Sequence, residues 1–122
     1  MKKENIGKVS VIVSTYNRCD ALQVCLRSLF QQAVLPDEVI IGDDGSTEET
    51  AVLIKKLQKE APFPLIHVWH EDKGYRLAMM RNKCVAKSSG NYIIEIDGDV
   101  FAHPLFVADH IKEATIGCYL KG

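Results

Sequence analysis

The sequence predicts an α/β fold of three layers, in which a mostly parallel sheet lies between two layers of helices. Two observations predict this class. Four short runs of β-branched and other apolar residues recur along the 122 residues, and each run is followed by a segment with helical spacing of its apolar residues. Strands that alternate with helices in this way form parallel βαβ units, in which helices cover both faces of the sheet. No repeat, low-complexity tract or linker interrupts the pattern, so we expect one domain over residues 1–122.

The first predicted strand covers residues 9–13, which are apolar apart from one serine. Such a run is typical of a strand that is buried on both faces. After a polar loop, Asp20 is the expected N-cap of a helix that ends before Pro36. The apolar stripe of this helix follows the spacing i, i+3, i+4, i+7, i+8 and consists of Leu22, Cys25, Leu26, Leu29 and Phe30.

The second strand is expected over residues 38–42, and a second helix follows it. Ser46 and Glu49 have the spacing of a capping box, so Ser46 is the expected N-cap of that helix. The helix ends before Pro62, and its inward-facing residues are Leu53, Ile54 and Leu57.

The second half of the chain continues the alternation. Strands are expected over residues 65–69 and 92–96, and helices over about 76–87 and 104–114. Gly90 is the expected C′ residue of the earlier helix, because glycine readily adopts the left-handed conformation that ends many helices. The resulting order of elements, β-α-β-α-β-α-β-α, supports the parallel sheet.

Composition and charge exclude several classes of protein. The 15 Lys and Arg residues nearly balance the 16 Asp and Glu residues, so the chain lacks the basic charge of a nucleic-acid-binding domain. No apolar run approaches the ~20 residues that span a bilayer, and residues 1–5 are too polar to begin a signal peptide. Four cysteines without a CxxC pair indicate reduced thiols. We therefore expect a cytoplasmic protein with no nucleic-acid partner and no transmembrane segment.

Polar side chains follow all four predicted strands. In open α/β sheets, ligands bind beyond the carboxyl ends of the strands, at the point where the strand order reverses. We therefore expect these side chains to converge on one rim of the sheet. They are Ser14, Thr15, Tyr16 and Asn17 after the first strand, Asp43 and Asp44 after the second, Lys73 and Tyr75 after the third, and Asp97 and Asp99 after the fourth.

Asp97 and Asp99 flank a glycine directly after a strand that we expect to be buried. Two carboxylates this close together resist joint ionisation unless a cation offsets them. Their oxygens suit Mg²⁺ or Mn²⁺, which proteins typically hold with one or two carboxylates and the phosphates of a substrate. A solvated Asp-Gly turn is the alternative, but the position at the carboxyl end of a strand favours a metal site. His103, four residues after Asp99, is a further candidate ligand for a metal or a phosphate.

A rim with two acidic clusters needs positive charge to hold a diphosphate. Lys73, Arg76 and Arg81 are the nearest basic side chains, and arginine pairs with phosphate oxygens through two hydrogen bonds. The alternative interpretation is that these arginines lie on a solvated helix face and bind no ligand. No glycine-rich phosphate loop of the GxGxxG or GxxxxGK[ST] type is present, which favours metal and arginine as phosphate ligands. His67 and His70 are three residues apart, and we interpret them as structural histidines rather than as a zinc pair.

These motifs resemble, in order and spacing, those of the inverting, GT-A-fold glycosyltransferases of family 2. The resemblance covers about residues 8–110. It is carried by the segments 9–18 (VSVIVSTYNR), 36–47 (PDEVIIGDDGST), 74–82 (GYRLAMMRN) and 89–99 (SGNYIIEIDGD). The resemblance implies a GT-A, Rossmann-like three-layer αβα fold, of which this chain would be a truncated part.

The resemblance also implies roles for the rim residues. Tyr16 would lie beside the nucleotide base, and Asp44 would accept a hydrogen bond from the base. Arg76 would approach the nucleotide or its phosphates. Asp97 would lie near the sugar or the ribose, and Asp99 would contact the divalent metal that bridges the two phosphates, so these two are the expected catalytic residues. The nucleotide-binding set implied by the rim and the resemblance is Ser14, Thr15, Tyr16, Asn17, Asp43, Asp44, Arg76, Arg81 and Asp97.

The implied activity is the transfer of a sugar from a nucleotide-diphospho-sugar, with a UDP-sugar as the expected donor, in glycan or polysaccharide biosynthesis. The acceptor would be a hydroxyl of a saccharide or of a lipid-linked molecule, and Mn²⁺ or Mg²⁺ would assist departure of the diphosphate with inversion at C1. A non-catalytic or truncated nucleotide-binding module and a nucleotidyltransferase are the alternatives. A receiver-like phosphoacceptor domain ranks low. It should have an acidic pair after the first strand and an acceptor aspartate at the end of the third, but here the first strand ends in Ser-Thr-Tyr-Asn and the third in His70.

One feature departs from the family pattern. In the family the general base is a carboxylate of the later, acceptor-binding half, and this sequence ends at Gly122. We interpret Asp109 and Glu113 as the solvated face of the last helix rather than as the base. We therefore expect the nucleotide-sugar-binding portion of a longer enzyme, without the acceptor-binding half. Such a portion is expected to self-associate through the face or edge it exposes, and to lie at the inner face of the membrane where acceptors are lipid-linked.

Overall fold

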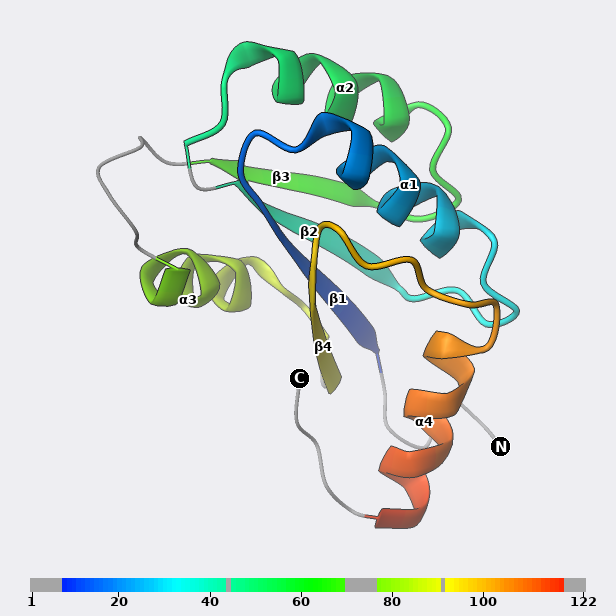
Figure 1. Cartoon of the computed structure of the whole chain (residues 1–122). Helices are drawn as coiled ribbons and strands as arrows, with labels where there is room; N and C mark the ends of the chain where they lie inside the picture. Colours follow the sequence, from blue (N-terminus) through cyan, green and yellow to red (C-terminus); the bar gives the residue numbers. More distant parts are fainter. Residues whose placement is uncertain (1–7, 44, 70–76, 91, 118–122) are drawn as a thin grey trace.

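The computed structural model describes residues 8–43, 45–69, 77–90 and 92–117 of the chain. Within these residues, four parallel strands form a sheet in the order β3-β2-β1-β4 (Figure 1). The strands are β1 (Val9–Thr15), β2 (Glu38–Asp43), β3 (Leu65–Trp69) and β4 (Tyr92–Asp97). The helices are α1 (Cys19–Phe30), α2 (Glu48–Gln58), α3 (Leu77–Lys87) and α4 (Phe106–Gly117). The predicted class, element order and parallel pairing are confirmed.

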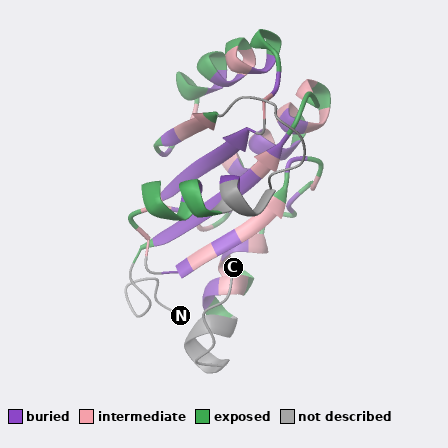
Figure 2. Ribbon diagram, turned by 90° about the vertical axis from the view of Figure 1, so that its left-hand side faces the viewer, coloured by how far each residue is buried: buried purple, intermediate pink, exposed green. Residues whose placement is uncertain are grey.

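Apolar side chains pack on both faces of the sheet. One face carries Val11 and Val13 of β1 against the apolar stripes of α1, α2 and α4. The opposite face carries Ile12, which packs with Met80 and Cys84 of α3. Figure 1 shows α1 and α2 on one side of the sheet and α3 on the other, and Figure 2 shows the central strands buried between exposed outer helix surfaces. Burial on both faces explains why the strand sequences are continuously apolar instead of alternating.

The strand order reverses beside β1. From β1 the chain moves outward through β2 to β3, and it then returns to place β4 on the other side of β1. Ser14 of β1 pairs with Asp97 of β4, and Thr15 pairs with Asp43 of β2. Three strands run one or two residues further than predicted, because these polar residues take part in the pairing. The carboxyl ends of β1 and β4 therefore meet at the switch point, where open sheets bind ligands.

A buried carboxylate holds the amino end of the sheet together. Glu38 accepts hydrogen bonds from Ser10 Oγ (2.6 Å), from the Ser89 backbone N–H (2.7 Å) and from Ser89 Oγ (3.2 Å). Gly90 packs against β1, and a Cβ at this position would collide with the Ser10 side chain. Gly90 lies three residues beyond the last residue of α3, so close packing, and not the predicted C′ conformation, requires a glycine here.

The predicted caps of the first two helices are wrong. α1 begins before Asp20, which lies in the first turn, where its charge still favours the helix dipole. The N-cap of α2 is Thr47, and Ser46 Oγ instead accepts a hydrogen bond from the Asn17 N–H (2.7 Å). Local spacing suggested a cap at Ser46, whereas the fold brings a distant N–H group to the same hydroxyl.

The last helix begins two residues later than predicted, at Phe106. The side chain of Gln32, which follows α1, accepts a hydrogen bond from the Val107 N–H at 2.9 Å. This contact satisfies one of the free N–H groups at the start of α4. In α3 the described residues start at Leu77, and Arg76 of the predicted helix lies outside them.

Candidate functional site

The turn that follows β4 lies directly against the end of β1. We call its residues, Asp97–Asp99, the acidic turn. The Gly98 N–H donates to the Ser14 carbonyl oxygen at 2.7 Å, and a Cβ at Gly98 would lie only 2.9 Å from that oxygen. Glycine is therefore required for this close approach. Both aspartates are exposed, so the turn presents two carboxylates at the switch point.

A buried hydroxyl group lies beside the acidic turn. Thr15 is 8% exposed, and its Oγ1 has no hydrogen-bond partner among the described residues. A Cβ at Gly98 would lie 3.4 Å from this oxygen, so the hydroxyl lies at the contact between β1 and the turn. A buried hydroxyl without a partner costs about 1–3 kcal/mol. This part of the rim therefore has a polar group available for a ligand.

The donor set of the acidic turn fits a hard divalent cation. No group of three or more His, Cys, Asp or Glu side chains that could hold a metal occurs in the described part of the chain. Two exposed carboxylates suit a metal whose other ligands are water and substrate phosphates, which is how Mg²⁺ is commonly held. His103, the further candidate ligand, accepts a hydrogen bond from the Leu105 N–H at Nδ1 (3.1 Å), and its Nε2 lies 3.9 Å from Asp109 Oδ2.

The loop after β1 is fastened to the loop after β2. Asn17 has a φ of 48°, a left-handed conformation that asparagine tolerates better than most residues. Its N–H donates to Ser46 Oγ at 2.7 Å, and its Oδ1 accepts from the Thr47 N–H at 2.8 Å. These two bonds fix the neighbouring Tyr16, which is 47% exposed at the carboxyl end of β1.

Asp43 belongs to a buried hydrogen-bond network at the end of β2. Its Oδ1 accepts from the Ser46 N–H at 2.9 Å, and its Oδ2 lies 2.8 Å from His67 Nε2. Trp69 Nε1 donates to the Ser46 carbonyl oxygen at 3.0 Å. Asp43 is fully buried, so it has no exposed surface to offer a ligand. His67 has the structural role predicted for it.

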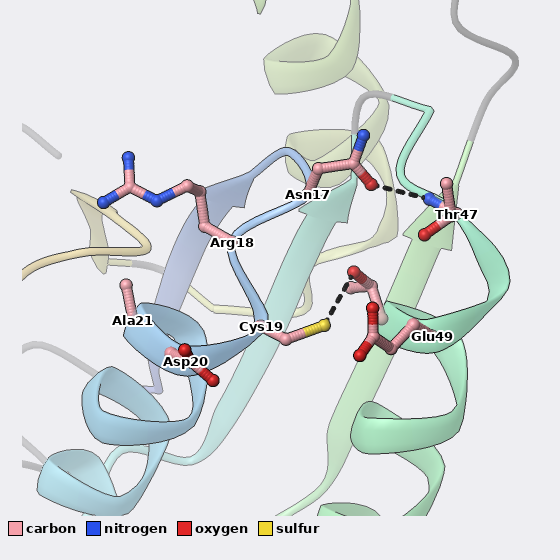
Figure 3. A pocket seen from close by; sticks show the side chains of 8 residues that line it. Asn17, Arg18, Cys19, Asp20, Ala21, Thr47 and Glu49 are labelled. Carbon is pink, nitrogen blue, oxygen red and sulfur yellow. Dashed lines mark hydrogen bonds between the residues drawn. The ribbon is translucent and has the colours of Figure 1, made fainter.

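A pocket of about 540 Å³ opens between the first turns of α1 and α2 (Figure 3). Two contacts join the residues on its two sides: the Thr47 N–H donates to Asn17 Oδ1, and Cys19 Sγ lies 3.3 Å from Thr50 Oγ1. The acidic turn contributes no residue to it, so this pocket is separate from the two exposed carboxylates. The lining residues are Asn17, Arg18, Cys19, Asp20, Ala21, Thr47, Glu49 and Thr50.

Comparison with known families decides the family of the chain. The family model described as Glycosyl transferase family 2 matches residues 10–119. The chain belongs to this family. The match includes the loops after β1 and β2, the acidic turn and all eight elements except the first residue of β1. The predicted resemblance is thus confirmed.

Curated relatives share this family-2 segment within longer proteins. Chondroitin synthase of Escherichia coli is 32% identical over 108 residues, which cover 88% of this chain and 16% of that protein. Validoxylamine A glucosyltransferase of Streptomyces hygroscopicus subsp. limoneus is 34% identical over 105 residues, covering 84% and 23%. The chain therefore spans less than a quarter of the length of either relative.

Solved structures confirm the GT-A fold. A structure of residues 1–349 of Staphylococcus aureus TarS matches with a TM-score of 0.72 at 25% identity, over 88% of this chain and 32% of that one. TarS has also been solved in complex with UDP-GlcNAc. The mannosyltransferase PcManGT from Pyrobaculum calidifontis, in complex with GDP-Man and Mn²⁺, matches with a TM-score of 0.78 at 24% identity, over 88% and 32%.

The described residues of this family-2 chain bring only part of the predicted site together. Ser14, Thr15 and the acidic turn meet at the switch point between β1 and β4. Tyr16 and Asn17 lie in the adjoining loop, and Asp43 lies buried beneath the loop after β2. Asp44, Lys73 and Arg76 lie outside the residues that the structure describes, and the structure does not describe the side chain of Arg81 on α3.

Sequence reasoning missed two residues near the site, Arg18 and Cys25. Arg18 is exposed in the loop after β1, and its side chain points away from Thr47 and Glu49 (Figure 3). No carboxylate among the described residues pairs with it, and its guanidinium adds positive charge at this end of the sheet. Its position, three residues after the end of β1, is a signal that could have identified it.

Beneath the turn, Cys25 Sγ donates to the Asp97 carbonyl oxygen at 3.9 Å. Burial raises the pKa of this thiol from 9.0 to about 12, and the negative charge of Asp99 adds to the shift, while a hydrogen bond with the Val100 backbone opposes it. The thiol therefore stays protonated and can remain a donor at neutral pH. In the sequence Cys25 looked like an ordinary core residue of α1.

In the described residues, no helix is both long enough and apolar enough to cross a membrane.

Proposed function

We propose that this chain is the donor-binding part of a glycosyltransferase that transfers a sugar from a nucleotide-diphospho-sugar, with a UDP-sugar as the expected donor. The acidic turn carries the proposal, because it presents two exposed carboxylates at the switch point of a family-2 chain. Solved proteins of the same fold bind UDP-GlcNAc in one case and GDP-Man with Mn²⁺ in another. These names support a nucleotide-sugar as the ligand class.

The loops after β1 and β2 would hold the nucleotide. Tyr16 is half exposed beside the rim and would contact the base, while Asn17 fixes the backbone of that loop. Asp43 acts as a positioning residue, because its two oxygens hold Ser46 and His67 and none of its surface is exposed. Asp44, Arg76 and Arg81 stay predicted contacts to the base and the phosphates.

The acidic turn would bind the diphosphate through a divalent cation, Mn²⁺ or Mg²⁺. Asp99 would be its protein ligand, and Asp97, at the end of β4, would lie near the ribose or the sugar. When bound, the cation supplies charge neutralisation for the departing diphosphate. Arg18 and the predicted basic residues would add positive charge at the same rim, and the unpartnered Thr15 hydroxyl would add a polar contact.

The acceptor hydroxyl would attack C1 of the sugar from the side opposite the diphosphate, which gives inversion. This attack requires a general base to remove the proton of the hydroxyl. We assign that role to no carboxylate among the described residues; Asp109, for example, is exposed on α4 near His103. A saccharide or a lipid-linked acceptor, the pathway, the cellular location and self-association stay predictions from the sequence.

Calorimetry of the 122-residue chain tests the proposal. UDP, GDP and their sugar conjugates would be titrated with Mn²⁺ and, separately, with EDTA. We expect UDP to bind with Mn²⁺ and to bind at least about tenfold more weakly in EDTA, because the diphosphate then faces two uncompensated carboxylates. A chain that is folded by circular dichroism and shows no metal-dependent binding of any of these nucleotides would overturn the proposal.

A nucleotide-binding module without transfer is the second candidate, because we assign the general base to no carboxylate among the described residues. A donor-hydrolysis assay separates the two candidates. Slow release of sugar from the bound donor by this chain would favour the enzyme. Tight, metal-dependent binding without turnover would favour the binding module, and incorporation of a nucleotide into a sugar phosphate would indicate a nucleotidyltransferase.

A further inference from the structure

Three buried side chains that are not hydrocarbons form a stripe along α1 and its C-terminal extension. Cys25, Ser28 and Gln32 follow the spacing i, i+3, i+7, which places them on one side of the helix. They are 0%, 6% and 6% exposed. We call these residues the α1 stripe. Buried polar groups are stable only with hydrogen-bond partners, so the partners of the stripe show what it does.

The first two residues of the α1 stripe bind the acidic turn and the segment directly after it. Cys25 Sγ donates to the Asp97 carbonyl oxygen at 3.9 Å. Ser28 Oγ accepts from the Ala102 N–H at 3.0 Å and donates to the Cys25 carbonyl oxygen at 2.6 Å. The hydroxyl of Ser28 therefore links the backbone of α1 to the backbone that follows the turn.

The last residue of the stripe, Gln32, binds the same segment nearer to α4. Gln32 Nε2 donates to the His103 carbonyl oxygen at 2.8 Å, and Gln32 Oε1 accepts from the Val107 N–H at 2.9 Å. The neighbouring Ala33 N–H donates to the Pro104 carbonyl oxygen at 2.9 Å. Figure 1 shows this segment running from the end of β4 along α1 to α4.

The segment depends on these bonds because it has no regular secondary structure between the acidic turn and α4. Its backbone groups therefore need partners from elsewhere. Two of its larger side chains cannot anchor it by burial, since Phe101 is 66% exposed and Leu105 is 52% exposed. Ala102 adds only one small buried side chain to the core, so the segment is attached mainly through its backbone, and the α1 stripe makes most of these attachments.

The two aspartates of the turn are held differently. Asp97 lies within β4 and pairs in register with Ser14 of β1, so the sheet fixes it. Asp99 lies beyond the strand, between the Gly98 bond to Ser14 on one side and the Ser28 bond to Ala102 on the other. Loss of the second attachment should therefore affect Asp99 more than Asp97.

We propose that the α1 stripe is a positioning device for the acidic turn, which holds Asp99 where it can bind the divalent cation of a nucleotide diphosphate. This inference rests on the proposed function. Its residues are positioning residues, since none of them is exposed to a ligand. α1 also begins directly after the loop that contains Tyr16 and Asn17, so one helix would place both the nucleotide loop and the metal-binding turn.

Ser28→Ala is the test variant, and Ser10→Ala is its matched control. Both serines are buried, and each donates one hydrogen bond, but Ser10 bonds to Glu38 at the opposite end of the sheet. Titrations of UDP with Mn²⁺ and with EDTA would be compared for the wild type and both variants. In Ser28→Ala we expect the gain in affinity from Mn²⁺ to fall about tenfold, as for residues that orient metal ligands, with the affinity in EDTA unchanged.

Ser10→Ala should keep the full gain from Mn²⁺ even if its thermal stability falls as much as that of Ser28→Ala. An equal gain in Ser28→Ala and the wild type would overturn the inference while leaving the proposed function intact. A wild type without metal-dependent binding would overturn both.

Amide hydrogen exchange tests the structural part without any ligand. The Val100 and Ala102 amides should exchange at least about tenfold faster in Ser28→Ala than in the wild type, since local opening is set by local contacts. Ser10→Ala should leave both rates unchanged. Equal rates in Ser28→Ala and the wild type would contradict the positioning role whether or not UDP binds.

Discussion

The two ends of the parallel sheet carry carboxylates that are used in opposite ways. At the amino end, Glu38 is 7% exposed and accepts three hydrogen bonds from Ser10 and Ser89. At the carboxyl end, Asp97 and Asp99 are exposed, and the nearby Thr15 hydroxyl has no partner among the described residues. Satisfied polar groups hold the fold, whereas exposed or unsatisfied polar groups at a switch point are available to a ligand.

Asp43 shows that position alone does not separate the two uses. It lies at the carboxyl end, in register with Thr15, yet it is fully buried and holds Ser46 and His67. In its burial and bonding Asp43 resembles Glu38 more than it resembles Asp99. Burial and hydrogen-bond partners, rather than the end of the sheet, therefore distinguish a structural carboxylate from a binding one.

The largest effect is expected at Asp99. Asp99→Asn should remove most of the gain in UDP affinity that Mn²⁺ provides, because loss of a direct metal ligand should cost more than loss of the contacts that support it. The free energy of unfolding should stay within about 0.5 kcal/mol of that of the wild type, since the residue is exposed. Asp109→Asn is the matched control, an exposed aspartate on α4 that should leave calorimetric binding unchanged. Equal affinities for the two variants would contradict the role of the acidic turn.

The opposite pattern is expected at the amino end. Glu38→Ala should lower the free energy of unfolding by about 3 kcal/mol, because it removes the partner of three buried or partly buried donors. UDP affinity of the folded fraction should stay unchanged. Urea denaturation checks the loss of stability. Calorimetry, at a temperature where the variant is folded, checks the UDP affinity. A loss of affinity without a loss of stability would break the comparison between the two ends.

Asp43 is expected to show both effects. Asp43→Asn should cost about 1–2 kcal/mol of stability, because an amide cannot accept from both Ser46 and His67. It should also weaken UDP binding several-fold in Mn²⁺ and in EDTA alike, since the disturbed loop belongs to the nucleotide side. A loss confined to Mn²⁺ would instead place Asp43 with the metal ligands.

Much of this fold could be predicted from the sequence, because the strands are short apolar runs and the helices have regular stripes. The caps at Asp20 and Ser46 could not, since Ser46 takes its partner, Asn17, from another loop. The rim could be predicted from the ends of the strands. The burial of Asp43 required the pairing of β2 with β3, which local spacing does not reveal.

The α1 stripe also escaped prediction, for a related reason. A cysteine within an apolar helix face looks like a core residue, and a serine or a glutamine looks like a surface residue. Only the path of the segment after β4 shows that Cys25, Ser28 and Gln32 all meet its backbone. Residues that bind side chains nearby in sequence are predictable, whereas these bind backbone about 70 residues away.

A smaller effect is expected from the buried thiols. Burial raises the pKa of Cys25 to about 12 and that of Cys84 to about 11, from an ordinary 9.0. Above pH 9 the unfolded chain loses these protons and the folded chain keeps them, so stability should fall as the pH rises from about 9 to 11. Cys25→Ala/Cys84→Ala should flatten the profile in urea denaturation at pH 8–10.5. A wild-type profile as flat as that of the double variant would contradict these shifts.

A crystal structure of the chain with UDP and Mn²⁺ tests the central claim most directly. The account predicts an anomalous manganese peak within coordination distance of the Asp99 carboxylate, about 2.0–2.3 Å as for other hard divalent ions, with the diphosphate on its far side and the base beside Tyr16. A manganese peak in the pocket between α1 and α2, or UDP bound with no contact to the acidic turn, would contradict it.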